Sequence, residues 1–191
     1  MIKSVIISGP PAIGKTTIAK GIGKEFGLRH LSGGDILKEL AQDEGFDTGG
    51  DDWWETPEGM SFLSHRQENS EFDKKVDAKL KKLFLEGNVV ITSYTLPWIV
   101  EGGVKIWLAG SMENSARRMT VRDNLSKNDT VKIVKKRYDE NKIIYKTLYG
   151  FEFGEDLSVF NKVIETDNLD AVHVLEVAKS TVRELFEIKT T

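Results

Sequence analysis

The chain has 191 residues, of which 39% are hydrophobic and 30% charged, so it is long enough for one compact domain with a buried core. The formal net charge of −3 provides no overall positive field that would attract nucleic acid or an anionic membrane. The sequence contains no cysteine, which excludes disulfides, thiolate catalysis and Cys-based zinc sites and fits a cytoplasmic protein. The apolar run near the N-terminus is too short for a signal peptide or a membrane span, so we expect no membrane partner.

The first half of the chain alternates short apolar runs with amphipathic segments. Val5 to Ser8 predicts a buried strand, and a helix is expected from about Lys15 to Phe26 with Gly27 as its stop. His30 and Leu31 predict a short second strand, and Asp35 to Asp43 looks helical. After a glycine-rich stretch at 45–59, a long helix is expected that carries Phe72 to Phe84 and ends at Gly87.

The second half continues this alternation. Strands are expected at 88–93, 104–109 and 162–165, and helices at about 114–123, at about 129–149 and from about 170 onward. Strands that alternate with helices predict an α/β fold in which helices cover both faces of a parallel sheet. Ligands of such sheets bind at the carboxyl ends of the strands.

A phosphate-binding loop follows the first strand. The stretch from Gly9 to Thr16 (GPPAIGKT) fits the pattern G-x-x-x-x-G-K-[ST] at every fixed position. Glycines let successive backbone N–H groups face one anion, and the following helix adds its N-terminal dipole. We expect Lys15 to reach the β- and γ-phosphates of a nucleoside triphosphate and Thr16 to be a Mg²⁺ ligand.

The remaining sequence favours a kinase of small molecules. The strand at 104–109 is not followed by the N-K-x-D of GTPases, and the strand that ends at Thr92 lacks the acid of larger ATPases. Arg117, Arg118 and Arg122 share one predicted helix, and Arg137 lies on the next. Positioned guanidinium groups stabilise the charge of a transferring phosphoryl group, so we predict an arginine-bearing lid.

The chain resembles the nucleoside-monophosphate kinases, and among them most the archaeal-type cytidylate kinases. The stretches that carry the resemblance cover most of the chain; they are ISGPPAIGKTTIAK, LSGGDILKELA, EFDKKVD, GNVVITSYTLPW, VKIWLAGSMENSARRMTVRD and YKTLYGFEFGEDLSVFNKVIETD. The resemblance implies a single P-loop kinase domain over 1–191 with a five-stranded parallel sheet. Its core would span about 1–31, 88–116 and 150–191, with an acceptor-binding lobe at about 32–87 and a lid at about 117–140.

The same resemblance implies transfer of the γ-phosphate of ATP, with Mg²⁺, to CMP or dCMP. ATP would lie on Gly9, Pro10, Pro11, Ala12, Ile13, Gly14, Lys15, Thr16 and Thr17. Lys15, Arg118, Arg122 and Arg137 would be catalytic. The acceptor would meet Ser32, Gly33 and Lys38, and the protein would act on small molecules as a monomer or homodimer.

Several positions depart from the family pattern. Thr92 and Tyr94 stand where the family carries an acid and an arginine, Lys38 replaces an arginine, and Ile144 replaces another. Arg66 and the Tyr94 hydroxyl are candidate substitutes on the acceptor side, with an exposed helix charge and a core cap as the alternatives. Asp35 is a candidate for orienting metal-bound water, with N-capping of the 35–43 helix as the alternative.

Two further features leave alternatives open. The adjacent Trp53 and Trp54 would stack on a base, pin the lobe to the core or face a second subunit. Asp73 and Asp77, four residues apart on one helix, would read an exocyclic amine, although solvated helix surface is the favoured interpretation. For the function as a whole, the alternatives are a kinase of another acceptor, such as AMP or shikimate, and a nucleotide-binding regulator with weak transfer activity.

Overall fold

The computed structural model describes residues 3–49, 53, 56–59, 61–62, 71–123 and 126–188, with the backbone alone at 122, 123 and 188. Its sheet has five parallel strands in the order β2-β3-β1-β4-β5. The strands are β1 (Ser4–Ser8), β2 (Arg29–Ser32), β3 (Val89–Thr92), β4 (Val104–Ala109) and β5 (Lys162–Glu165). This confirms the predicted α/β fold and every predicted strand, with bounds that differ by a residue or two.

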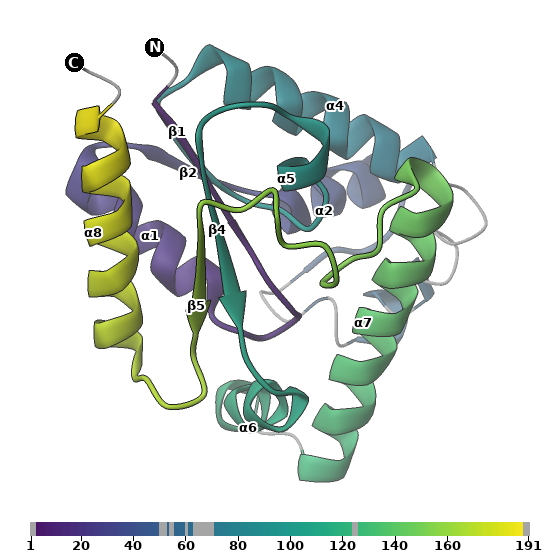
Figure 1. Ribbon diagram of the computed structural model, residues 1–191. Coiled ribbons are helices and arrows are strands. Elements are labelled where there is room, and N and C mark those ends of the chain that lie inside the picture. Colours follow the sequence, from purple (N-terminus) through teal and green to yellow (C-terminus); the bar gives the residue numbers. More distant parts are fainter. Residues whose placement is uncertain are drawn as a thin grey trace.

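Helices cover both faces of the sheet (Figure 1). They are α1 (Lys15–Phe26), α2 (Gly33–Asp43), α4 (Glu71–Glu86), α5 (Leu96–Ile99), α6 (Met112–Asp123), α7 (Lys127–Tyr149) and α8 (Ala171–Ile188). The sequence reasoning did not predict α5, a single turn with Pro97 in its first turn. No helix within the described ranges is both long and apolar enough to cross a bilayer.

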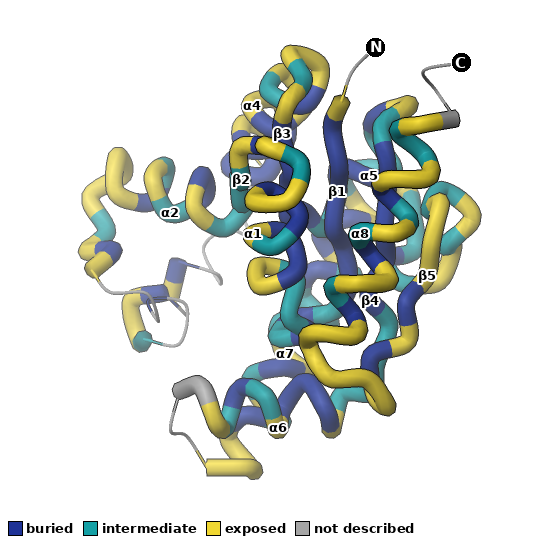
Figure 2. Tube along the Cα trace, turned by 90° about the vertical axis from the view of Figure 1, so that its left-hand side faces the viewer, coloured by how far each residue is buried: buried dark blue, intermediate teal, exposed yellow. Residues whose placement is uncertain are grey.

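The alternation of side chains along β1 divides the core into two layers. Val5 and Ile7 pack with α1 and α8 in one cluster, whereas Ile6 packs with α2 and α4 in the other. Because β1 is covered on both faces, its three central residues are all apolar and the strand is buried along its whole length (Figure 2).

A third apolar cluster packs α7 and the segment after it against β4. Most of its members are aromatic, and the ring centroids of Trp107 and Phe153 lie 5.4 Å apart. Trp98 of α5 stacks on Phe151 at 4.5 Å. This cluster fixes α7 beside the carboxyl ends of the strands, where the candidate site lies.

Trp53 belongs to the second cluster and does not face the cavity described below. Its exposed fraction is 1%, and its ring centroid lies 5.5 Å from that of Phe62. Of the three interpretations of the tryptophan pair, the structure therefore favours pinning to the core for Trp53. Trp54 lies outside the described residues.

Candidate active site

The loop from Gly9 to Gly14 turns sharply between β1 and α1. Its φ angles are +146° at Gly9, +58° at Ala12 and +102° at Gly14. A Cβ on Gly9 would lie 2.4 Å from the backbone oxygen of Leu108 in β4, so only glycine fits there. The loop therefore has the strand–loop–helix context in which the motif binds phosphate.

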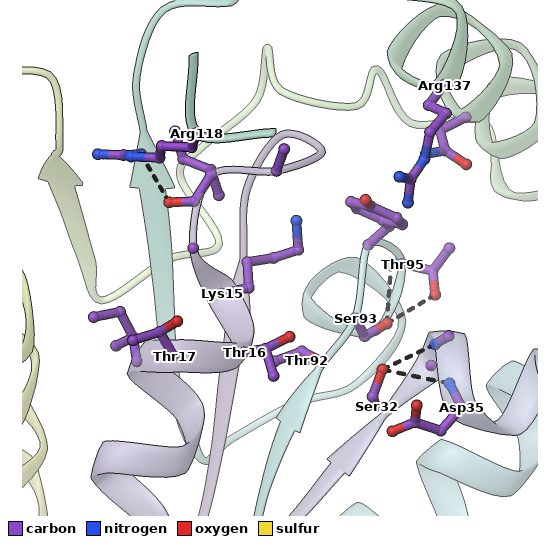
Figure 3. A pocket seen from close by; sticks show the side chains of 18 of the residues that line it. Lys15, Thr16, Thr17, Ser32, Asp35, Thr92, Ser93, Thr95, Arg118 and Arg137 are labelled. Carbon is purple, nitrogen blue, oxygen red and sulfur yellow. Dashed lines mark hydrogen bonds between the residues drawn. The ribbon is translucent and has the colours of Figure 1, made fainter. Parts of the chain in front are cut away.

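Lys15 begins α1, and its ammonium group reaches back over the loop. Its Nζ donates hydrogen bonds to the carbonyl oxygens of Gly9 at 2.9 Å and Pro10 at 2.6 Å, and lies 4.5 Å from the centroid of the Tyr94 ring. Desolvation lowers the pKa of Lys15, and the positive charge of Arg137 lowers it further. Figure 3 shows Lys15 and Arg137 pointing from α1 and α7 toward the same part of the cavity.

Arg118 lies on the other side of the phosphate loop. Its guanidinium donates a hydrogen bond to the carbonyl oxygen of Ile13 at 2.9 Å (Figure 3). It also donates to Thr166 Oγ1 at 3.2 Å and to the Thr166 carbonyl oxygen at 3.1 Å. Desolvation is the main cause that lowers the pKa of Arg118. Arg118 thus links the phosphate loop to the end of β5, and the structure does not bring it beside Arg137. The Arg122 side chain is outside the described part of the chain.

The segment after β5 contributes residues that sequence reasoning did not single out. The Asp167 carboxylate accepts hydrogen bonds from the Ser111 N–H at 2.9 Å and from Asn114 Nδ2 at 2.9 Å. These donors lower the pKa of Asp167, so it joins the end of β5 to the start of α6 as an anion. In the sequence, the polar residues Thr166 and Asp167 directly after the predicted strand at 162–165 could have indicated that this segment contributes to the site.

On the acceptor side, Ser32 caps α2. Its Oγ accepts hydrogen bonds from the N–H groups of Gly34 at 3.1 Å and Asp35 at 3.4 Å (Figure 3). The interpretation of Asp35 as the N-cap is therefore wrong, because the helix begins at Gly33 rather than at Asp35. Ser32, Gly33 and Asp35 line the cavity, whereas Lys38 lies outside its lining and Arg66 outside the described residues.

The residues after β3 form a hydroxyl-rich turn into α5. Ser93 Oγ accepts hydrogen bonds from the N–H groups of Thr95 at 3.2 Å and Leu96 at 3.1 Å. Thr92 and Tyr94 line the cavity on either side of Ser93. This turn places the Tyr94 ring over Lys15.

Asp73 and Asp77 are both buried, with exposed fractions of 5% each, and both line the cavity. The favoured interpretation of these residues as solvated helix surface is therefore wrong. A polar stripe on a helix reads the same in a sequence whether it faces bulk water or a polar cavity.

One cavity of about 870 Å³ joins these parts. One end is walled by the phosphate loop and the start of α8, including Ala171 and Val174. The other end is walled by α2 and α4, with α7 and the turn after β3 between the two. Within the described residues, no group of three or more His, Asp or Glu side chains is arranged to hold a metal ion.

The comparison with family models decides the class of this site. Residues 4–168 match the cytidylate kinase-like family. The chain belongs to that family. Its members are P-loop phosphotransferases, so the chain is an ATP-dependent enzyme of the nucleoside-monophosphate kinase class.

Sequence comparison with individual proteins supports the assignment of this chain to the cytidylate kinase-like family. A cytidylate kinase from Methanocaldococcus jannaschii is 29% identical over 95% of this chain and 98% of its own length. A cytidylate kinase from Pyrobaculum aerophilum is 34% identical and covers 89% of each chain. A solved structure of shikimate kinase from Acinetobacter baumannii in complex with shikimate has a TM-score of 0.59 at 14% identity, with 100% of this chain and 97% of that chain covered. At that identity the likeness shows the P-loop kinase fold alone.

Proposed function

We propose that the chain transfers the γ-phosphate of ATP to CMP or dCMP, giving ADP and the corresponding diphosphate. The observation that carries the proposal is the single cavity that runs from the phosphate loop to α2 and α4. Its volume of about 870 Å³ is in the upper range of small-molecule sites, as expected if two ligands meet inside it. The relatives with coverage of nearly the whole chain are named cytidylate kinases, which supports the choice of acceptor.

In this account, the donor and acceptor occupy opposite ends of the cavity. The triphosphate would lie on Gly9 to Thr17, of which Ala12 to Thr17 line the cavity, and the acceptor would lie against α2 and α4 near Ser32 and Gly33. The acceptor lobe at about 32–87 and the lid at about 117–140 would close over them and exclude water. Such closure matters because water would otherwise compete with the acceptor for the γ-phosphate.

The transfer itself requires positive charge and alignment. An acceptor phosphate oxygen forms a bond to the γ-phosphorus while the bond from that phosphorus to the β–γ bridging oxygen breaks, and ADP leaves. Lys15 and Arg137, which point toward the same part of the cavity, would offset the charge of the transferring group. Arg118, with its hydrogen bonds to Ile13 and Thr166, would hold the phosphate loop in place, and Arg122 would add charge from the same helix.

The residues present fit a Mg²⁺ ion that arrives with ATP. Mg²⁺ keeps several waters and binds through few protein ligands together with substrate phosphates, so a large acidic cluster is not required. The Thr16 hydroxyl would be a direct ligand, and Asp35 would hold metal-bound water, since both residues line the cavity. When bound, the ion would neutralise charge on the phosphates.

We also propose that the protein works in the cytoplasm, as a monomer or a homodimer.

An acceptor panel tests this proposal. Purified protein with ATP and Mg²⁺ is offered CMP, dCMP, UMP, AMP, GMP and shikimate in turn, and ADP release is measured. The proposal expects the highest kcat/KM with CMP or dCMP. Turnover confined to AMP or to shikimate would overturn it, and ATP binding without acceptor-dependent turnover would indicate a regulator instead.

A further inference from the structure

Two consecutive arginines of α6 line the end of the cavity at the phosphate loop. Arg118 is held there by its hydrogen bonds to Ile13 and Thr166, whereas Arg117 has an exposed side chain. Desolvation is the main cause that lowers the pKa of Arg118, and the positive charge of Arg117 lowers it further. Like charges that are held close together repel, and an anionic ligand relieves the repulsion. The pair therefore suits an anion in this part of the cavity.

Arg117 is anchored by Asn114, one turn before it on α6. Asn114 Oδ1 accepts a hydrogen bond from Arg117 Nη2 at 2.6 Å, and Asn114 Nδ2 donates one to Asp167 Oδ1 at 2.9 Å. A guanidinium only donates and a carboxylate only accepts, so the two partners hold the amide in one orientation. Asn114 is itself buried, and the Ser111 N–H holds the Asp167 carboxylate. Asn114 thus ties Arg117 to the segment that follows β5.

Gly110, between β4 and α6, lets the chain pass close to that segment. A Cβ on Gly110 would lie 2.7 Å from Thr166 Oγ1 and 2.9 Å from Asp167 Oδ1. A side chain there would displace the oxygen atoms that anchor the two arginines, because Thr166 accepts from Arg118 and Asp167 accepts from Asn114. The glycine therefore allows one segment to hold both Arg117 and Arg118 at the phosphate loop.

The anchor on Arg117 leaves most of its guanidinium for a ligand. A guanidinium carries several N–H donors in a planar fork, and the hydrogen bond to Asn114 uses only one of its nitrogens. Arginine pairs with phosphate through two parallel hydrogen bonds in many sites. A long side chain that is ordered before the ligand arrives loses less freedom on binding. Arg117 is therefore preorganised for a phosphate group in the cavity that it lines.

We propose that Arg117 contacts the phosphates of ATP and that Asn114 is the positioning residue that orders Arg117 before ATP binds. Asp167 is the fixed point to which Asn114 is tied. The inference rests on the proposed function in placing ATP at this end of the cavity. It does not depend on which acceptor receives the phosphate.

Titration calorimetry with ATP and Mg²⁺, in the absence of any acceptor, measures the contribution of Arg117. We expect Kd for ATP to rise at least about fivefold in Arg117→Ala, because hydrogen bonds between charged groups are lost. Arg117→Lys keeps the positive charge, and its Kd should stay within about threefold of the wild-type value. Arg183→Ala is the matched control and should leave Kd unchanged, because Arg183 is an exposed arginine of α8 that donates to Glu25 and does not line this cavity.

A double-mutant cycle separates positioning by Asn114 from a purely structural role. Asn114→Ala should raise Kd about 2- to 10-fold when Arg117 is present, because Arg117 must then be ordered as ATP binds. In the Arg117→Ala background the same substitution should have no further effect on Kd. An equal rise in both backgrounds would overturn the assignment of Asn114. Asn114→Ser, which keeps a polar group, takes its place in the cycle if Asn114→Ala does not fold.

Three other outcomes would also contradict the inference. An unchanged Kd in Arg117→Ala would overturn it while the proposed function stood. A loss in Arg117→Lys as large as that in Arg117→Ala would overturn the assignment to phosphate, because the flat guanidinium rather than its charge would then be the important feature. Absence of ATP binding by the wild type would overturn the inference together with the donor half of the proposed function. Because these titrations contain no acceptor, they decide the inference even if the acceptor panel excludes CMP and dCMP.

Discussion

The ring of Tyr94 lies against the ammonium group of Lys15, with 4.5 Å between the ring centroid and Nζ. Tyr94 comes from the turn after β3, and Lys15 from the start of α1, so the contact joins the acceptor side of the cavity to the phosphate loop. An aromatic face attracts a cation, and the attraction increases when the pair is partly desolvated. Tyr94 therefore holds the ammonium group where the two ends of the cavity meet.

Replacement of Lys15 by alanine should remove the charge that the phosphate loop presents to the triphosphate. We expect kcat to fall at least about 100-fold, because loss of one preorganised electrostatic contact to a transition state has an effect of that size. The circular dichroism spectrum should not change. Lys24→Ala, an exposed lysine in the last turn of the same helix, is the matched control and should retain wild-type kcat.

Two variants of Tyr94 separate the ring from its hydroxyl. Tyr94→Phe keeps the ring face over Lys15 and should retain activity within about threefold. Tyr94→Ala removes a cation–π contact of about 0.5–2 kcal/mol, so kcat/KM should fall about 2- to 30-fold. Equal losses in the two variants would show that the hydroxyl, rather than the ring, is the important group.

Gly9→Ala should disrupt the phosphate loop for a steric reason. The new Cβ would lie 2.4 Å from the backbone oxygen of Leu108, and φ at this residue is +146°. We expect the free energy of unfolding to fall by more than about 2 kcal/mol, with loss of ATP binding measured by calorimetry. Gly45→Ala is the control, since Gly45 has φ +89° with nothing within 4 Å of the added Cβ. Gly45→Ala therefore introduces backbone strain without a steric clash, and its free energy of unfolding should fall by about 1–2 kcal/mol.

Stability should depend on pH through His30 in β2. Burial lowers the pKa of His30 from its ordinary value of 6.5, and Asp35 and Lys20 act on it in opposite directions. The unfolded chain therefore binds a proton more readily than the folded one, so the free energy of unfolding should decrease as pH falls below about 6.5. The change should be below about 1 kcal/mol, because the side chain is only partly buried.

Chemical denaturation between pH 5 and pH 7.5 measures this effect. His30→Gln should flatten the profile over that range, because glutamine does not titrate. An unchanged slope in His30→Gln would show that other groups cause the pH dependence.

The sequence predicted the fold best where the pattern of apolar residues along a strand or helix shows which of its faces are buried. Val5 to Ile7 is apolar without interruption because β1 is covered on both faces, and the glycines after the strand fix the phosphate loop. The single turn of α5 escaped prediction because four residues are too few to show a helical period. Its position is set by the hydrogen bonds of Ser93, which depend on the tertiary path of the turn.

The acceptor end of the cavity was less predictable. Asp73 and Asp77 occupy a polar stripe on α4 that has the pattern of a solvated surface, and only the three-dimensional packing shows that it faces a cavity. Arg118 was correctly placed on a helix beside the site, but its contacts with Ile13 and Thr166 join segments that are far apart in the sequence. Such long-range hydrogen bonds leave no local signal.

The central claim is that one cavity holds the donor and the acceptor nucleotides together. Binding of a bisubstrate analogue, in which adenosine and cytidine are joined by a chain of phosphates, tests it most directly by titration calorimetry. We predict one analogue per chain, binding more tightly than ATP or CMP alone, and competition with both nucleotides. Binding no tighter than that of ATP, with CMP still able to bind in full, would contradict the claim.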